Sequence, residues 1–315
     1  MSEHAHPRRS DLTICLFCGG EGRDEFGLLS KFFARRALGE EAQLVETFRC
    51  GDCESRFFKI DVADEALGRL YSGYRGEDYF RLRHGFEPWY TRAINDGIGG
   101  EAEFAARRRA LLDVLARAGI ANRFGDVLDH GGDRGQMVAP GGGLCADRPA
   151  VFEVSGVAPE PGVEAIDRAL LRARAWDLIL SCHVLEHVSD PRGYMGDLVK
   201  LGRPGSLFFI EVPDERYTSS AFNGSAAQKA WLSWLATTEL PFKALDFLST
   251  GLRVKLGLVP PFGFVALREH LQVFTVKGLK AFLESFNLDA LTCEVARTGH
   301  IVALARKGPR RVQGA

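Results

Sequence analysis

One stretch constrains the fold of this chain more than any other. It reads Gly125-Asp-Val-Leu-Asp129-His-Gly131-Gly132-Asp133-Arg-Gly135, a short apolar run that ends in an acid and leads into a glycine-rich turn. A second apolar run that carries an acid, Val151-Phe-Glu153-Val, follows it. Glycines allow a tight turn and let backbone N–H groups approach a ligand, and an acid at the end of the next strand suits a ribose diol. The pattern predicts a nucleotide-type site on an open α/β sheet.

Strands and helices alternate through the rest of the chain. Apolar runs predict strands at 126–129, 151–154, 176–181, 206–213, 288–295 and 301–305, with helices at 101–118, 191–201 and 277–286. The run at 176–181 has the apolar density of a strand buried in a parallel sheet. The 101–118 helix is amphipathic, and its Arg-rich face is expected to be solvated.

Two Cys-x-x-Cys pairs lie near the N-terminus, Cys15/Cys18 and Cys50/Cys53. Each pair places two thiolates around a tight turn, and two such turns can supply a tetrahedral four-sulfur zinc site. A strand pair or a helix can fill the stretch between the pairs, and 25–38 is expected to be partly helical. Such a site has no open position, so the predicted zinc is structural. Two unrelated pairs, or a redox dithiol, are the alternatives. The redox alternative is the weaker one because neither pair stands at a strand-to-helix turn of a βαβ unit.

Composition excludes several classes of protein. The chain has 315 residues, a net charge of −1, and 46% hydrophobic and 26% charged residues, as in an ordinary globular protein. There is no global basic field, so no nucleic-acid partner is expected. The polar N-terminus lacks the apolar core of a secretory signal, and no apolar run is long enough to cross a membrane. We expect a cytoplasmic protein, and the sequence carries no signal of oligomeric state.

The expected organisation has three parts. Residues 1–70 form the zinc-binding module, 71–120 an aromatic, charged linker with a helical segment, and 121–315 the α/β domain. Residues 214–269 form a helical insertion that interrupts the alternation. Its aromatic side chains and the turn at 259–263 fit a lid, a dimer surface, a peripheral contact with a membrane-bound substrate, or additional core. An insertion after a strand's carboxyl end favours the lid. The aromatic residues at 71–90 fit either a ligand-binding segment or a packed linker.

The strand at 176–181 leads into Cys182-His183-Val184-Leu185-Glu186-His187-Val188. Together with the turn at 129–135 and Glu153, this segment resembles class I S-adenosylmethionine-dependent methyltransferases, in the branch with Leu-Glu-His-Val after the fourth strand. His270-Leu-Gln-Val-Phe274-Thr275 is similar to that branch's His-x-x-Phe-Phe-Thr or Ser signature. The resemblance covers about 124–306. The cysteine pairs and the Tyr-Arg-Gly-Glu-x-Tyr segment at 74–79 resemble a subset that serves surface-polysaccharide and natural-product sugar pathways.

The resemblance implies a Rossmann-like, doubly wound, mostly parallel seven-stranded sheet with a small N-terminal zinc-ribbon-like module and a helical insertion. It also implies S-adenosylmethionine as cofactor. The residues expected to bind this cofactor are Asp129, Gly131, Gly132, Asp133, Gly135, Glu153 and Cys182. The family's middle glycine is Asp133 here, and Asp tolerates unusual dihedral angles better than most residues. Asp133 is also a candidate for contacting the methionine ammonium.

Three residues are candidates for catalysis. His183 follows the strand at 176–181 and can act as a general base or pack over the cofactor. Glu186 opens the next helix, where a carboxylate is favourable on dipole grounds alone, so a structural role is as plausible as a catalytic one. His270 follows the insertion and can take a hydroxyl proton as a neutral imidazole, or serve only the structure.

The predicted function is O- or C-methylation of a sugar, sugar nucleotide, glycan or other small-molecule acceptor. A non-catalytic scaffold of the same fold, which binds a protein partner through the zinc module, is the alternative. An NAD-dependent oxidoreductase is disfavoured because the turn lacks the Gly-x-Gly-x-x-Gly order.

Overall fold

The computed structural model of the chain describes residues 8–41, 43–215, 222–258, 264 and 266–309. It divides into two compact units. The first unit consists of Met1–Ile98 and Glu215–Val273, and the second of Gly99–Asp214 and Phe274–Ala315. The segment expected to be an insertion therefore belongs to the same unit as the N-terminal segment, and the divisions fall at different positions from the expected 70 and 120. The turn expected at 259–263 lies outside the described residues.

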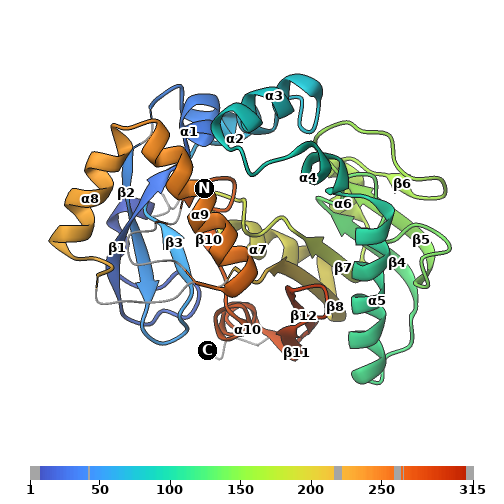
Figure 1. The fold of residues 1–315 in the computed structure, drawn as a ribbon. Coiled ribbons are helices and arrows are strands. Elements are labelled where there is room, and N and C mark those ends of the chain that lie inside the picture. Colours follow the sequence, from blue (N-terminus) through green and yellow to red (C-terminus); the bar gives the residue numbers. More distant parts are fainter. Residues whose placement is uncertain (1–7, 42, 216–221, 259–263, 265, 310–315) are drawn as a thin grey trace. The chain divides into compact units, whose positions relative to one another are not determined.

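The second unit holds a seven-stranded sheet with the order β11-β12-β8-β7-β4-β5-β6 (Figure 1). Five neighbouring strands, β8, β7, β4, β5 and β6, are mutually parallel. Strand β12 runs antiparallel to both β8 and β11. The predicted mostly parallel, seven-stranded, Rossmann-like sheet is confirmed. Its strands are β4 (Arg123–His130), β5 (Cys145–Phe152), β6 (Glu164–Ala165), β7 (Trp176–Cys182), β8 (Gly202–Pro213), β11 (Leu288–Val295) and β12 (His300–Lys307).

Local sequence explains where the helices of this unit begin. In α7, Pro191 occupies the first turn and the Asp190 side chain accepts a hydrogen bond from the Gly193 N–H, which caps the helix. Thr275 caps α10 in the same way through the Gly278 N–H. The helices are α5 (Glu101–Arg117), α6 (Arg168–Ala173), α7 (Pro191–Leu201) and α10 (Val276–Glu284).

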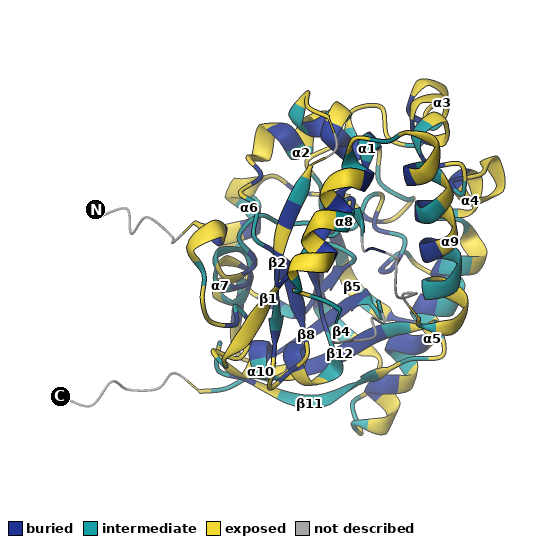
Figure 2. Cartoon of the chain, turned by 60° about the vertical axis from the view of Figure 1, so that its left-hand side comes forward, coloured by how far each residue is buried: buried dark blue, intermediate teal, exposed yellow. Residues whose placement is uncertain are grey.

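Helix α5 packs its apolar side against the sheet. Phe104, Leu111, Val114 and Leu115 join a buried cluster with strand residues that include Phe209 and Val302. The strands β8 and β12 are mostly dark blue in Figure 2, which marks buried residues. The prediction that the Arg-rich face of this helix is solvated is wrong at one position, since Arg107 is only 6% exposed.

The first unit holds a five-stranded sheet with the order β10-β3-β2-β1-β9. Only β1 and β9 pair in parallel, while β1 with β2, β2 with β3 and β3 with β10 are antiparallel. The two edge strands come from the later chain segment. The strands are β1 (Gly22–Leu29), β2 (Leu44–Cys50), β3 (Arg56–Phe58), β9 (Ala266–Leu267) and β10 (Gln272–Val273).

The helices of this unit also come from both segments. In Figure 1 the blue strands β1 and β2 lie beside the orange helix α8, although they are far apart in sequence. The helical character expected for 25–38 is confirmed only after residue 30, since β1 occupies the first part. The helices are η1 (Arg9–Asp11), α1 (Lys31–Phe33), η2 (Ala34–Leu38), α2 (Asp64–Tyr71), α3 (Glu77–Phe86), α4 (Arg92–Gly97), α8 (Ala226–Ala236) and α9 (Leu240–Leu256).

A network of buried charges connects the two segments of the first unit. Arg268 donates to Glu87 (3.0 Å) and to Asp246, and all three side chains are at most 10% exposed. Arg83 bonds Glu87 (3.0 Å) and Glu269 (2.8 Å). Buried charges are tolerated only when they are paired, so these contacts fix the later segment against the earlier one.

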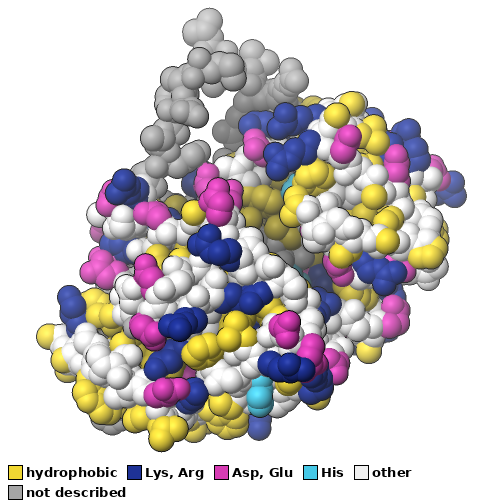
Figure 3. Space-filling model, turned by 90° about the horizontal axis from the view of Figure 1, so that it is seen from above, with side chains coloured by type: hydrophobic (Ala, Val, Ile, Leu, Met, Phe, Trp, Pro, Cys, Tyr) yellow, Lys and Arg dark blue, Asp and Glu magenta, His cyan; other side chains and the backbone are white. Residues whose placement is uncertain are grey.

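Charged and apolar side chains are mixed on one face of the structure. On the face in Figure 3, basic and acidic side chains alternate, so no field of one sign covers that face. The described part of the chain contains no helix that is long and apolar enough to cross a membrane.

Candidate functional site

Strand β4 lies at the point where the order of the second unit's sheet changes direction. It pairs with β5 on one side and with β7 on the other, and all three strands are parallel. Ligands of open α/β sheets bind outside the carboxyl ends of the strands at this kind of switch point. The carboxyl ends of these three strands carry Asp129, Glu153 and Cys182.

The turn after β4 is formed by residues with left-handed backbone conformations. Gly131 has φ +74°, Gly135 has φ +78°, and Asp133, which replaces the expected glycine, has φ +54°. The Asp133 carboxylate accepts a bond from the Gln136 side chain at 3.0 Å. The turn thus forms with aspartate at this position.

A side chain at any of the three glycines of this turn would clash with neighbouring atoms. A Cβ on Gly132 would lie 2.1 Å from the Asp129 carboxyl carbon, and one on Gly131 would lie 2.7 Å from the Val184 side chain. A Cβ on Gly135 would lie 2.8 Å from the Val163 side chain. The backbone of the turn therefore runs directly over the end of β4.

Asp129 is fully buried under this turn. Neither of its carboxylate oxygens has a hydrogen-bond partner among the described residues. Burial raises the pKa of this carboxyl to about 7, although the positive charge of Arg107 acts in the opposite direction. A buried, unpartnered carboxylate is costly by itself, so the position favours a ligand that brings a cation or hydrogen-bond donors.

Glu153 stands just beyond the end of β5 and faces the turn. Its carboxylate accepts bonds from the backbone N–H groups of Asp133 (3.2 Å) and Ser155 (2.9 Å). A carboxylate offers about four acceptor positions, so further donors can bind here.

Three polar side chains contact one another here: His130 at the end of β4, Ser181 near the end of β7 and Tyr194 of α7. The sequence analysis did not single out His130 and Tyr194. The Tyr194 hydroxyl is 2.8 Å from the Ser181 hydroxyl and 3.0 Å from His130 Nδ1. Burial lowers the pKa of His130 to about 4, so this ring is neutral at physiological pH. A tyrosine one turn into the helix that follows a sheet strand is the signal that could have identified this group. Cys182, beside Ser181, is buried, and burial raises the pKa of its thiol.

A second polar group lies where β7, β8 and β12 meet. His183 Nδ1 is 3.0 Å from Glu186 Oε1, and His183 Nε2 is 3.3 Å from His300 Nδ1. His300 Nδ1 is also 2.9 Å from Glu211 Oε1. Glu211 and Glu186 are fully buried. Two of the three expected catalytic residues, His183 and Glu186, thus belong to this group.

Glu211 is held by a cation as well as by histidine. Side chains alternate along a strand, so Glu211 faces the same side as Leu207 and Phe209, which pack on α5. Arg107 of α5 donates to its other oxygen at 2.8 Å. Burial alone would raise the pKa of Glu211, but the hydrogen bond to His300 and the charge of Arg107 outweigh it and lower the pKa to about 2. An acid within the apolar strand at 206–213 was the sequence signal for this residue.

Comparison with known families gives the context of these residues. The family model described as "Methyltransferase domain" matches residues 104–292. The chain belongs to this family. The methyltransferase domain includes the Asp129 turn, Glu153 and the residues after β7, as the sequence resemblance predicted.

Individual relatives are distant. An "Uncharacterized methyltransferase" of Mycobacterium avium (strain 104) is 29% identical over 181 residues, 57% of this chain and 60% of the relative. This chain thus matches only 60% of that protein's length. A "Ubiquinone biosynthesis O-methyltransferase" of Parvibaculum lavamentivorans is 37% identical over 60 residues, which are 19% of this chain and 23% of that protein. Among solved structures, magnesium protoporphyrin IX methyltransferase from Synechocystis is 12% identical with a TM-score of 0.43, over 78% of this chain and 100% of that one.

His270, the third expected catalytic residue, belongs to the first unit, whereas His183 and Glu186 belong to the second. Its Nδ1 lies 3.2 Å from Glu215 Oε1. Arg253 also donates to that oxygen, at 2.9 Å. These contacts lie within the first unit, and the catalytic role of His270 stays a prediction.

The aromatic segment at 71–90 also lies in the first unit. Tyr79 is buried, with its ring 5.2 Å from that of Tyr74. Tyr74 is 39% exposed, and the Arg75 guanidinium lies 4.8 Å from its ring centre. Of the two expected roles, packing describes Tyr79, while Tyr74 is accessible for binding and Arg75 is half-buried beside it.

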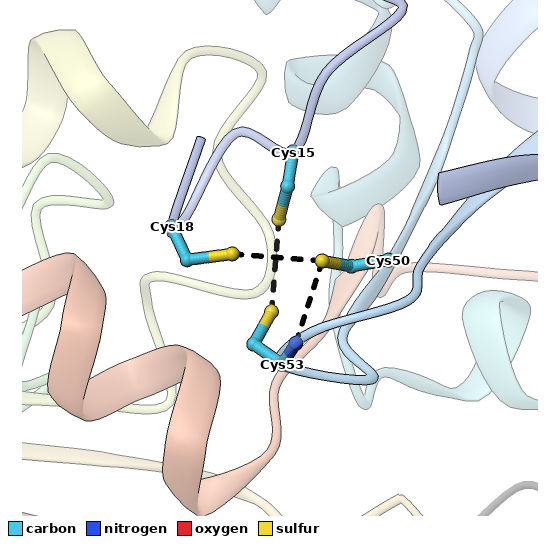
Figure 4. A group of neighbouring side chains, drawn as sticks. All are labelled: Cys15, Cys18, Cys50 and Cys53. Atoms are coloured by element: carbon cyan, nitrogen blue, oxygen red, sulfur yellow. Dashed lines mark hydrogen bonds between the residues drawn. The ribbon is translucent and has the colours of Figure 1, made fainter. Parts of the chain in front are cut away.

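The four cysteines of the first unit converge (Figure 4). The Sγ atoms of Cys15 and Cys53 are 3.7 Å apart, and those of Cys18 and Cys50 are 3.5 Å apart. For zinc–sulfur bonds of about 2.3 Å, a tetrahedral site needs sulfurs about 3.8 Å apart. Backbone N–H groups at residues 17, 20 and 53 point at these sulfurs from 3.4 Å. The geometry and the donor set fit a closed four-sulfur metal site.

Proposed function

We propose that this protein is an S-adenosylmethionine-dependent methyltransferase. The observation that carries the proposal is the buried Asp129 carboxylate without a partner beneath the glycine turn. The methionine end of the cofactor carries an ammonium group, which would supply the missing counter-charge. Burial makes this contact stronger than it would be at the surface, because the surrounding dielectric is low.

Glu153 is the proposed partner of the cofactor's ribose. Two backbone N–H groups already hold its carboxylate in place. The remaining acceptor positions suit a pair of neighbouring hydroxyl groups. A site that binds an ammonium at β4 and a diol at β5 distinguishes this cofactor from simple phosphates or nucleotides.

The cofactor supplies an electrophilic methyl group, so the protein's own residues mainly bind, orient and exclude water. The left-handed backbone at Gly131 and Gly135 fixes the turn over β4, and buried Cys182 packs at the end of β7. A hydroxyl acceptor must also lose a proton. His183, held by Glu186 at 3.0 Å, is the group we propose to serve this need.

The proposed acceptor is a sugar or a sugar-containing molecule. The support is the cysteine module together with the Tyr74–Arg75 pair, which offers an exposed aromatic face and a guanidinium. Aromatic faces stack on sugar rings, and guanidinium groups bind phosphate. We also propose that the four cysteines hold one structural zinc, which fits a reducing compartment such as the cytoplasm.

Calorimetry with S-adenosylhomocysteine, the demethylated cofactor, tests the cofactor site. Glu153→Ala should weaken binding by about 1–3 kcal/mol through the loss of charge-assisted bonds. Asp147→Ala is the matched control, because this exposed acid lies in the first half of β5 and pairs with Arg123. Unchanged affinity in Glu153→Ala would remove this residue from the site, and no binding to the wild-type protein would refute the proposed function.

The acceptor is tested separately by methyl transfer from labelled cofactor to a panel of nucleotide sugars. Label in a sugar product supports the proposal. Label only in non-sugar acceptors overturns the acceptor class and leaves the methyltransferase activity standing.

A further inference from the structure

The group formed by His183, Glu211 and His300 has the composition of a metal site. One ring nitrogen from each histidine and one carboxylate oxygen lie within 4.8 Å of one another. The His300 Nδ1 atom is 3.3 Å from His183 Nε2 and 2.9 Å from Glu211 Oε1. Ligands bound to one ion at about 2.0–2.1 Å in tetrahedral geometry are about 3.4 Å apart. The observed separations are close to that value.

One proton position in this group can be taken by a metal ion instead. An ionised Glu186 only accepts, so His183 Nδ1 carries the proton of the 3.0 Å contact. The neutral ring then has a lone pair at Nε2, which faces His300. Glu211 Oε1 presents a second lone pair to the same His300 nitrogen. A neutral His300 with its proton on Nδ1 would share that proton between these two acceptors. With the proton on its Nε2 instead, His300 Nδ1 is a third lone pair, and the three atoms together can bind one metal ion.

The surroundings hold these three atoms in place as metal-site surroundings do. Metal-binding histidines usually donate their other nitrogen to a carboxylate, and Glu186 provides this for His183. Arg107 holds the second oxygen of Glu211 at 2.8 Å and leaves Oε1 free to face the histidines. Strands β8 and β12 are paired beside the group, and His183 N–H donates to the Glu211 carbonyl at 2.8 Å. The three side chains therefore stand on rigid, hydrogen-bonded backbone.

We propose that His183, Glu211 and His300 bind one divalent first-row transition-metal ion. Two imidazoles and one carboxylate suit such ions, and three protein ligands leave coordination positions open. The histidine side chains are 25% and 23% exposed, so a further ligand can reach the ion. This site is distinct from the four-cysteine site, which is closed.

One consequence rests on the proposed methyltransferase function. An acceptor hydroxyl bound to the ion would lose its proton more readily, since metal ions act as Lewis acids. In that case His183 holds the metal and does not itself take the proton. The binding test below does not depend on this consequence.

The test uses full-length protein with zinc bound at the four cysteines and adds Co²⁺ as the probe. The expected result is one additional Co²⁺ per chain, with visible absorption bands but without the thiolate-to-cobalt charge-transfer band that a cysteine site gives. His300→Ala should weaken this binding by about 100-fold or more, and Glu186→Gln by about 10–100-fold. His183→Asn is the second ligand variant, because Asn tolerates the φ of +57° at this position.

Controls separate metal binding from folding and from the cofactor site. His84→Ala removes a histidine whose Nδ1 contacts the Tyr90 carbonyl, and it should bind Co²⁺ like the wild type. Thermal melting and calorimetry with S-adenosylhomocysteine show whether each variant is folded. Absence of an additional Co²⁺ in folded wild-type protein overturns the proposal and leaves a shared proton in the group. If the folded His300→Ala and His183→Asn variants bind Co²⁺ with the affinity of the wild type, the proposal is overturned as well.

Discussion

Asp129 offers the sharpest test of the cofactor site, because its carboxylate is buried and has no partner in the described part of the chain. We predict that Asp129→Asn stabilises the ligand-free protein and weakens the binding of S-adenosylhomocysteine. Both effects have the same origin. The wild-type chain keeps a costly carboxylate for a cationic ligand, and asparagine removes both that cost and the charge.

The pKa of Asp129 sets the size of the effect on stability. Burial raises it from 3.8 to about 7 in the folded protein. The unfolded chain therefore ionises first, and the free energy of unfolding falls as the pH rises from about 4 to about 7, by about 1.4 kcal/mol per pH unit. The full loss is about 4 kcal/mol above pH 7. Asp129→Asn does not undergo this loss of stability. The difference in the free energy of unfolding between the variant and the wild type should therefore be largest at pH 8 and small at pH 4.

Cofactor binding should show the opposite dependence on pH. Below pH 7 the carboxyl is protonated, so binding an ammonium requires the release of a proton. Wild-type affinity for S-adenosylhomocysteine should rise about 100-fold from pH 5 to pH 8 and then level off. Asp129→Asn should bind about 10–150-fold more weakly than wild type at pH 8, with little difference between the two at pH 5.

Denaturant unfolding at several pH values measures the first effect. Titration calorimetry in buffers of different ionisation enthalpy measures the second, including the proton released. Asp147→Asn is the control, since this exposed aspartate lies on β5 and pairs with Arg123. A wild-type affinity that stays constant from pH 5 to pH 8 would refute the reasoning, and so would equal affinity of wild type and Asp129→Asn at pH 8.

Three further predictions concern the structure around the sites. Cys50→Ser should abolish zinc retention, measured by elemental analysis, and should lower the melting temperature, whereas the exposed Cys145→Ser should do neither; zinc at one per chain in Cys50→Ser would contradict this. Gly135→Ala should cost about 2 kcal/mol or more, since it combines left-handed backbone with a Cβ 2.8 Å from Val163, and an unchanged denaturation midpoint would contradict the described turn. Arg268→Met should cost about 3–5 kcal/mol by leaving buried carboxylates without their cation, and a melting curve like that of wild type would show that those carboxylates are neutral.

The sequence predicted those parts of the fold that depend on local pattern. The apolar density at 176–181 and the acid–glycine turn identified β7 and the end of β4, and Pro191 marked the first turn of α7. Strand β5 begins at Cys145, earlier than the expected 151, because its first half is polar and is held by pairing with β4 and not by its own burial. Pairing between strands is not visible in a local pattern.

The sequence did not predict features that depend on distant partners. The start of the predicted 25–38 helix is strand β1, because Phe26 and its neighbours pair with β2. His300 lies just before the predicted strand at 301–305 and was not a candidate site residue, because its contact with Glu211 depends on the register of β8 and β12. Arg107 looked like part of a solvated face, because nothing in its helix reveals a buried acid on a strand about one hundred residues later.

The five-stranded sheet has a consequence for how the chain is made. Its outer strands, β9 and β10, are synthesised after the whole of β4 to β8. During translation, β1 and β3 therefore leave both sides of a partial sheet open while most of the other unit emerges from the ribosome. Open strand edges are sites of aggregation. A metal ion captured early by the four cysteines would hold the nascent hairpins together until the closing strands arrive, so zinc supply during synthesis should govern the yield of correctly folded protein.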